Sequence, residues 1–188
     1  DIYEKYISDW VKYKYFLPSR VHIDNEYLVV TQELHGEPFL VDNIVAEESL
    51  DLVLPPILEL CKYAQENKLY ADPHIKNFTI KDKKLMYVDI SPPYSKEYNK
   101  AVIKKTNNKL EKHIVRSNCE FFRWDWLPFH FAGDLLSINF ESILFFDYLY
   151  EEMRCLLPRD IDKEMFYQKA ILVRYYEDKR SLLGLNLL

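Results

Sequence analysis

The chain has 188 residues, 48% of them hydrophobic, and a formal net charge of −5. This length suits one ordinary domain or two small lobes with a sizeable core, and fifteen Tyr and eleven Phe against three Gly exclude a disordered chain. The scattered acidic residues argue against nucleic acid or an anionic membrane as the main partner, and mildly favour a cationic substrate.

The spacing of the cysteines and the hydropathy of the chain indicate its cellular compartment. Cys61, Cys119 and Cys155 are odd in number and widely spaced, with no CxxC pair or Cys/His cluster, so neither a disulfide framework nor a zinc site is expected. The sequence shows no apolar signal segment at its start and no uninterrupted apolar run of about 18 residues, as a membrane span requires. These features predict a cytoplasmic protein in a reducing environment, with no membrane partner.

The N-terminal part predicts a helix followed by a β-hairpin. Apolar residues recur at helical spacing from Asp1 to about Phe16, and Pro18 helps to end that helix. Residues 21–23 and 27–32 are rich in β-branched residues and flank a polar turn, which predicts two strands. Residues 33–38 then do not continue the strand pattern of residues 27–32.

The middle of the chain predicts a long helix and a second hairpin. Residues 49–69 are mostly helical in pattern, with Pro55-Pro56 either interrupting the helix or lying at its start. Two apolar strands, 78–80 and 85–90, then flank the polar turn 81–84. The amphipathic helix would lead the chain directly to Asp72, just before this hairpin.

The remainder predicts helices. Residues 96–115 are polar and basic and suit a surface helix, while 132–156 and 162–176 are amphipathic and are separated at Leu157-Pro158-Arg159. The dense aromatic segment 121–127 is more typical of a core than of a substrate pocket. The fold class expected from this order of elements is α+β.

Three oxygen-bearing side chains around the second hairpin suggest a metal site. Asp72 is followed five positions later by Asn77, and Asp89 ends the second strand. Carboxylate and amide oxygens are hard ligands of the kind that Mg²⁺ takes, together with phosphate oxygens. Phosphoryl transfer needs such a metal and a carboxylate that positions the attacking hydroxyl. Taken singly, each residue also suits a turn or a cap.

This pattern resembles the catalytic and metal-binding segments of the protein-kinase-like superfamily, in which Asp-x-x-x-x-Asn precedes a hairpin that ends in a metal-binding Asp. His74, two residues after Asp72, is similar to the aminoglycoside phosphotransferase and choline kinase branch. The resemblance implies that Asp72 is the catalytic base, that Asn77 and Asp89 hold Mg²⁺, and that His74 lies near the transferred phosphate. Lys76 is expected to help neutralise phosphate charge.

The resemblance also implies a lobe organisation and a nucleotide. Residues 1–34 would be a partial small lobe, residues 35–40 the hinge, and residues 41–188 a helical large lobe. Backbone groups near Glu33 and Leu34 would face the adenine of ATP. The usual Gly-rich hairpin and Lys-bearing strand are not visible, so the N-terminal lobe is expected to be truncated or reduced.

The expected function is an ATP- and Mg²⁺-dependent phosphotransferase that acts on a hydroxyl of a small molecule. Two alternatives remain open. One is a pseudokinase or interaction module that keeps the kinase-like fold without turnover, which the missing phosphate-gripping groups favour. The other is a helical binding domain that takes no nucleotide.

Overall fold

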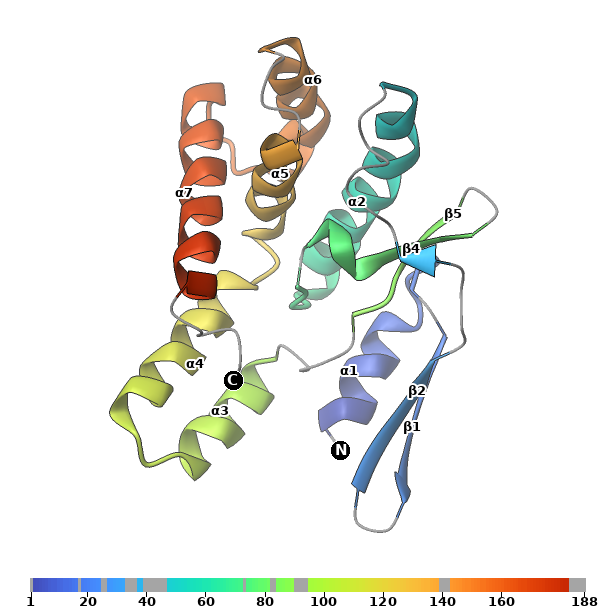
Figure 1. The fold of residues 1–188 in the computed structure, drawn as a ribbon, viewed down its shortest axis with the longest axis vertical. Helices are drawn as coiled ribbons and strands as arrows, with labels where there is room; N and C mark the ends of the chain where they lie inside the picture. Colours follow the sequence, from blue (N-terminus) through green and yellow to red (C-terminus); the bar gives the residue numbers. More distant parts are fainter. Residues whose placement is uncertain are drawn as a thin grey trace.

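Apolar residues at helical and alternating spacing build long helices and two small antiparallel sheets (Figure 1). The computed structural model describes residues 2–16, 18–24, 27–32, 37–38, 47–72, 74–81, 84–89, 95–138 and 143–182. The α+β class that the sequence predicts is confirmed.

The helices and strands follow one another along the chain with short connections. The α-helices are α1 (Ile2–Trp10), α2 (Glu47–Asn67), α3 (Lys96–Lys105), α4 (Lys109–Phe121), α5 (Leu127–Ile138), α6 (Ile143–Met153) and α7 (Lys163–Leu182). The strands are β1 (Ser19–Asp24), β2 (Tyr27–Gln32), β3 (Glu37–Pro38), β4 (Phe78–Lys81) and β5 (Lys84–Tyr87). Two short 3-10 helices are η2 (Ile75–Asn77) and η3 (Arg154–Leu156).

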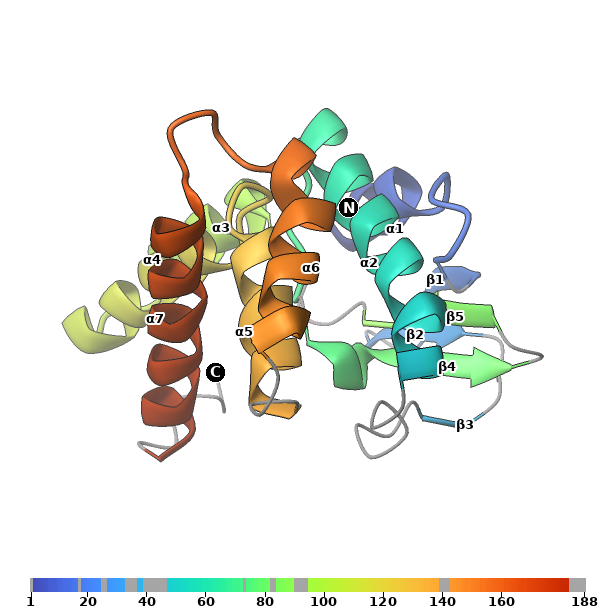
Figure 2. The ribbon, with the colours of Figure 1, turned by 90° about the horizontal axis from the view of Figure 1, so that it is seen from above.

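Both predicted hairpins are present. β1 pairs antiparallel with β2, with Val21 opposite Val30, and β4 pairs antiparallel with β5, with Phe78 opposite Tyr87. The short strand β3 adds to the outer edge of β4. Figure 2 shows the hairpins together on one side of the molecule, next to α1 and α2, with α5, α6 and α7 towards the other side.

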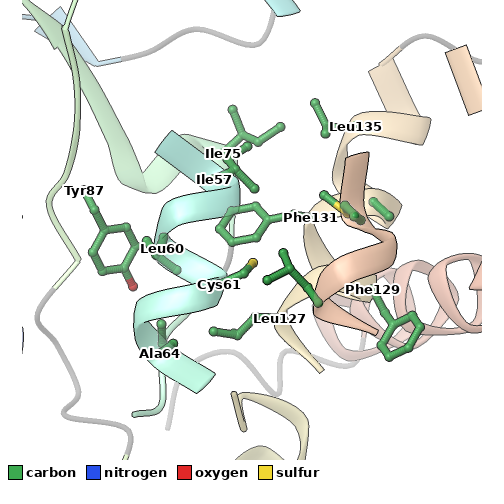
Figure 3. Close-up of a cluster of buried hydrophobic side chains, with 14 of the residues drawn as sticks. Ile57, Leu60, Cys61, Ala64, Ile75, Tyr87, Leu127, Phe129, Phe131 and Leu135 are labelled. Carbon is green, nitrogen blue, oxygen red and sulfur yellow. The ribbon is translucent and has the colours of Figure 1, made fainter. Parts of the chain in front are cut away.

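The core lies on both sides of α2. Ile57, Leu60, Cys61 and Ala64, which have the i, i+3, i+4, i+7 spacing of one helix face, are 0% exposed. Figure 3 shows this face against Phe131 of α5, and other core side chains of α5 lie in the same view. α2 therefore links the sheet side of the molecule to the helical side.

Aromatic rings join α1 to the second hairpin. Trp10 is 0% exposed, and its ring centroid lies 5.7 Å from Tyr63 of α2 and 5.7 Å from Tyr87 of β5. Tyr13 donates a hydrogen bond of 2.8 Å to the carbonyl of Pro56. The predicted division into residues 1–34, 35–40 and 41–188 stays a prediction, but α1 shares one hydrophobic core with α2 and α5.

The helical side is packed closely. A Cβ on Gly133 of α5 would lie 2.8 Å from the carbonyl oxygen of Ala170 in α7. Only a residue without a side chain permits the two helix backbones to approach so closely at this point. This close packing brings Arg174 of α7 next to Asp134 of α5, where the guanidinium and carboxylate lie 3.0 Å apart.

Several predicted boundaries are wrong. The first helix ends at Trp10 instead of near Phe16, because turns at 11–15 lead into a β-bridge between Phe16 and Tyr87. α2 continues through Pro55 and Pro56, so the pair neither interrupts the helix nor lies at its start. Packing of the α2 face in the core outweighs the backbone hydrogen bonds lost at the two prolines.

The predicted bounds of the later helices are also wrong, and α7 extends to Leu182, beyond the predicted end at Tyr176. The segment 96–115 is divided between α3 and α4 by residues 106–108, and 132–156 is divided between α5, α6 and η3. The predicted separation at Leu157-Pro158-Arg159 is confirmed. None of the helices in the described ranges is both long and apolar enough to cross a lipid bilayer.

Candidate functional site

A tight turn at the end of α2 directs the chain into the loop of Asp72. Lys68 has a φ of 54°, in the left-handed region that favours glycine, and the backbone N–H of Leu69 donates to the carbonyl of Ala64 at 2.9 Å. The backbone N–H of Ala71 then donates to the carbonyl of Phe122 at 3.2 Å. The loop is therefore fixed at its entrance before it reaches Asp72.

The predicted metal residues come together. Nδ2 of Asn77 lies 3.1 Å from the carbonyl oxygen of Asp72 and 3.4 Å from Oδ2 of Asp89. The backbone N–H of Val88 donates to the carbonyl of Asn77 at 2.9 Å, which holds the end of β5 beside η2. The fold thus gathers three residues that are up to seventeen positions apart in the sequence.

Tyr87 fixes the backbone of Asp72. Its hydroxyl lies 3.2 Å from the backbone N of Asp72 and 3.1 Å from the backbone O of the same residue. The Tyr87 side chain is 0% exposed and also packs on Trp10 and Phe78. A buried ring with its polar end bonded to the loop leaves Asp72 little freedom to move.

His74 lies between two carboxylates. Its Nε2 is 3.4 Å from Oδ1 of Asp72, and its Nδ1 is 3.5 Å from Oδ2 of Asp134. The doubly protonated imidazolium donates from both nitrogens, whereas a neutral ring has one donor and would leave one carboxylate facing an acceptor. The geometry therefore favours a cationic ring next to the predicted base.

Asp134 holds this arrangement from α5. Its Oδ2 accepts from the backbone N–H of Ile75 at 2.9 Å, and its Oδ1 accepts from Arg174 at 3.0 Å. Burial alone would raise the pKa of Asp134, but the hydrogen bond and charge of His74, the Ile75 N–H and the Arg174 guanidinium hold that pKa below its ordinary value. Asp134 therefore stays ionised in a largely buried position.

Asp134 and Arg174 are the residues that sequence reasoning missed as part of this site. No motif in the sequence connects Asp134 or Arg174 to the loop of Asp72. The available signal was one acidic residue inside the mostly apolar sequence of α5, since a buried carboxylate needs partners. The sequence could not identify those partners, because His74 and Arg174 are 60 and 40 positions away.

Of the other predicted site residues, Lys76 lies within the described part of the chain. Lys76 is exposed on η2, and the contacts known for the described residues do not connect its ammonium group to Asp72 or Asp89. Glu33 and Leu34 lie outside the described residues. Of the predicted hinge, Glu37 and Pro38 are described, and they pair with Ile80 and Thr79 on β4.

The aromatic segment behaves as core and surface structure. Nε2 of His130 lies 2.7 Å from the carbonyl oxygen of Phe121, and the ring stacks against Phe122. Arg123 and Asp125 form a local ion pair with 2.6 Å and 2.7 Å contacts. These contacts indicate structural roles for His130, Arg123 and Asp125.

The donor set at Asn77 and Asp89 suits a hard cation. Within the described ranges, no three His, Cys, Asp or Glu side chains gather as a metal-binding group. A site of one carboxylate and one amide is still consistent with Mg²⁺, which commonly keeps water and phosphate oxygens as its other ligands. The residues present therefore fit Mg²⁺ held jointly with a phosphate, but not a metal held by protein groups alone.

Comparisons of the chain with models of protein families, with curated proteins and with solved structures found no match.

Proposed function

We propose that the chain is a kinase-like phosphotransferase, with a reduced N-terminal lobe, that uses ATP and Mg²⁺ to phosphorylate a hydroxyl of a small molecule. The observation that carries the proposal is the meeting of Asn77 with both the Asp72 backbone and the Asp89 carboxylate. The register of the hairpin, with Phe78 opposite Tyr87, brings residue 77 beside residues 88 and 89, and the chain has an amide and a carboxylate at the two positions where the proposed metal site needs them.

Asp72 is the residue proposed to accept or orient the proton of the acceptor hydroxyl. Its backbone is fixed by Tyr87, and its carboxylate lies beside His74. The carboxylate of Asp72 is the form that can accept a proton, and Nε2 of His74 lies 3.4 Å from its Oδ1. The fixed position supplies orientation, which is a major part of the rate gain in phosphoryl transfer.

Asn77 and Asp89 are the residues proposed to hold Mg²⁺ through their side-chain oxygens. A bound Mg²⁺ would neutralise charge on the phosphate oxygens during transfer. The hydrogen bond from Asn77 to the Asp72 carbonyl holds this proposed metal ligand next to the proposed base. His74 and the exposed Lys76 would add positive charge to the loop.

The metal assignment is tested by calorimetric titration of ATP with and without Mg²⁺. Replacing Asp89 by Asn removes the only carboxylate proposed as a metal ligand, so Mg²⁺-dependent ATP binding should weaken on the order of a hundredfold. The matched control is Asp160→Asn, because Asp160 is exposed and remote from Asn77 in the described contacts. Equal Mg²⁺-dependent binding by the wild type and Asp89→Asn would reject the assignment.

A second candidate is a kinase-like module without turnover. The observation that favours it is that Oδ1 of Asp72 is buried and faces His74 instead of open solvent. An ATP turnover assay with hydroxyl-bearing small molecules on the longest natural form separates the two candidates. ADP release that depends on the acceptor and is lost in Asp72→Asn supports the enzyme, and ATP binding without release supports the module.

The third reading, a helical domain that takes no nucleotide, is distinguished by thermal unfolding. Ligand that binds only the folded state raises the apparent midpoint temperature. An unchanged midpoint in millimolar ATP and Mg²⁺ would support this reading over both kinase-like candidates.

A further inference from the structure

A groove lies next to the candidate site but contains none of its residues. Its volume is about 510 Å³, and its walls come from α1, the end of α2, Tyr70, the start of α3 and Trp124. Figure 1 shows α1 and α3 near each other, and the rings of Tyr3 and Tyr98 make an edge contact at 6.2 Å. This volume is in the range of sites for small organic ligands.

Three lysines gather around this groove. Lys5, Lys68 and Lys96 come from three separate segments, and all are exposed. In the part of the chain that the structure describes, none of the three forms an ion pair, although Asp9 and Glu97 also line the groove. Three lysines against two carboxylates give the lining a net charge of +1, opposite in sign to the net charge of −5 on the whole chain.

The backbone adds to this positive character. Ser95 caps α3 by accepting from the backbone N–H of Tyr98 at 3.1 Å, so the N–H groups of Lys96 and Glu97 in the first turn have no partner within the helix. Lys68 occupies a left-handed position, with φ 54°, where glycine is the least strained residue. A lysine there places its charge on the groove at a cost in backbone strain.

Aromatic rings form another part of the lining. Tyr70 and Trp124 make an edge contact with centroids 5.5 Å apart, and both line the groove together with Tyr6. The hydroxyl of Tyr6 donates to the carbonyl of Tyr70 at 3.1 Å, which holds two sides of the groove together. Ring faces and edges of this kind suit a flat organic group.

We propose that this groove is a binding site for a small aromatic anion, in the class of the aryl phosphate monoesters. The anionic group is bound by the three lysines and the first turn of α3, and the ring lies against Tyr70 and Trp124. The site is separate from the proposed metal site and does not depend on the proposed function, because Asp72, Asn77 and Asp89 do not line the groove.

The proposal is tested with 1-naphthyl phosphate as the probe, by calorimetry and by quenching of Trp fluorescence, on the full chain. The wild type should bind the probe saturably, with an affinity that falls as salt rises. Lys68→Gly removes one charge and relieves the left-handed strain, so it should fold at least as well as the wild type. Its dissociation constant should rise about two- to fivefold, and on the order of tenfold or more when combined with Lys5→Met.

The matched control is Lys62→Met, an exposed lysine on α2 that does not line the groove, and it should change the dissociation constant less than twofold. Asp89→Asn should bind the probe as the wild type does, which separates a failure here from a failure of the metal site. Absence of saturable binding, or an equal loss in Lys62→Met and Lys68→Gly, would overturn the proposal.

Two simpler ligands test the two parts of the proposed site. 1-Naphthol lacks the anion and inorganic phosphate lacks the ring, so both should bind more weakly than 1-naphthyl phosphate. Equal affinity for 1-naphthol would refute the role of the lysines, and equal affinity for inorganic phosphate would refute the role of the rings.

Discussion

The aromatic cluster around Trp10 and the charged cluster around Asp134 both hold the loop of Asp72, and they do so by different forces. On the first side, buried rings pack together, and Tyr87 extends from them to bond the Asp72 backbone. On the second side, Asp134 binds His74, the Ile75 N–H and Arg174. Apolar packing depends little on pH, whereas the charged cluster depends on the ionisation of its members.

This difference indicates that the position of the Asp72 loop and the charges around it depend on different residues. The aromatic side fixes where the loop lies relative to α1, α2 and β5, and it belongs to the main hydrophobic core. The charged side sets the electrostatic surroundings of His74 and Asp72. Mutations on the two sides should therefore differ in size and in pH dependence.

The largest effect is expected from Trp10→Ala. Trp10 is fully buried among five other rings, so truncation leaves a cavity and should lower the free energy of unfolding by about 3–5 kcal/mol. Urea denaturation followed by circular dichroism measures this. Trp10→Phe should cost about 1–2 kcal/mol, because it keeps much of the ring packing and removes an indole N–H that has no acceptor among the described residues.

Val11→Ala is the neighbouring control, because Val11 is 55% exposed. It should change the free energy of unfolding by less than about 0.5 kcal/mol. A loss in Trp10→Ala no larger than the loss in Val11→Ala would show that the aromatic cluster does not stabilise the fold.

A smaller loss is expected from Asp134→Ala. This change leaves the Ile75 N–H and the Nδ1 of His74 without their acceptor and should cost about 2–3 kcal/mol. Arg174→Met should cost less, about 0.5–1 kcal/mol, because the Arg174 side chain is 38% exposed and its ion pair is partly screened. Chemical denaturation of the two variants at neutral pH measures the difference.

Asp134→Ala also tests how the free energy of unfolding depends on pH. The pKa of Asp134 is lower in the folded protein than its ordinary value of 3.8, so its ionisation stabilises the fold above that value, and this contribution is lost as pH falls through the folded pKa. The difference in unfolding free energy between the wild type and Asp134→Ala should therefore be largest above about pH 5 and shrink towards lower pH. A difference that grew on acidification would contradict this. For Trp10→Phe, the corresponding difference should stay nearly constant.

A loss smaller than that of Asp134→Ala is expected from Gly133→Ala. The added methyl group would meet the Ala170 carbonyl, so α5 and α7 must move apart, at a cost of about 1–2 kcal/mol. Because this shift separates Asp134 from Arg174, the variant should also lose part of the pH dependence described above. Ala132→Gly on the same helix is the control for helix propensity, and it should preserve the pH dependence.

The elements with strong local patterns were predictable. Both hairpins and the apolar face of α2 were predicted from alternation, turn residues and helical spacing, and the structure has them. The predicted boundaries were wrong where contacts between distant residues determine where an element ends. Phe16 leaves the helical pattern because it bridges to Tyr87, and the two prolines stay within α2 because that helix has the core on both sides.

The sequence by itself determined which residue types are available around the second hairpin: two acids, an amide and a histidine at fixed spacing. It also determined the α+β class, since periodicity depends only on near neighbours. Tertiary structure alone decided that Asp134 of α5 lies beside His74 and pairs with Arg174 of α7. The physical reason is that these contacts join elements far apart in the chain, and their geometry is set by the packing of α5 against α7 and of the hairpin against α2.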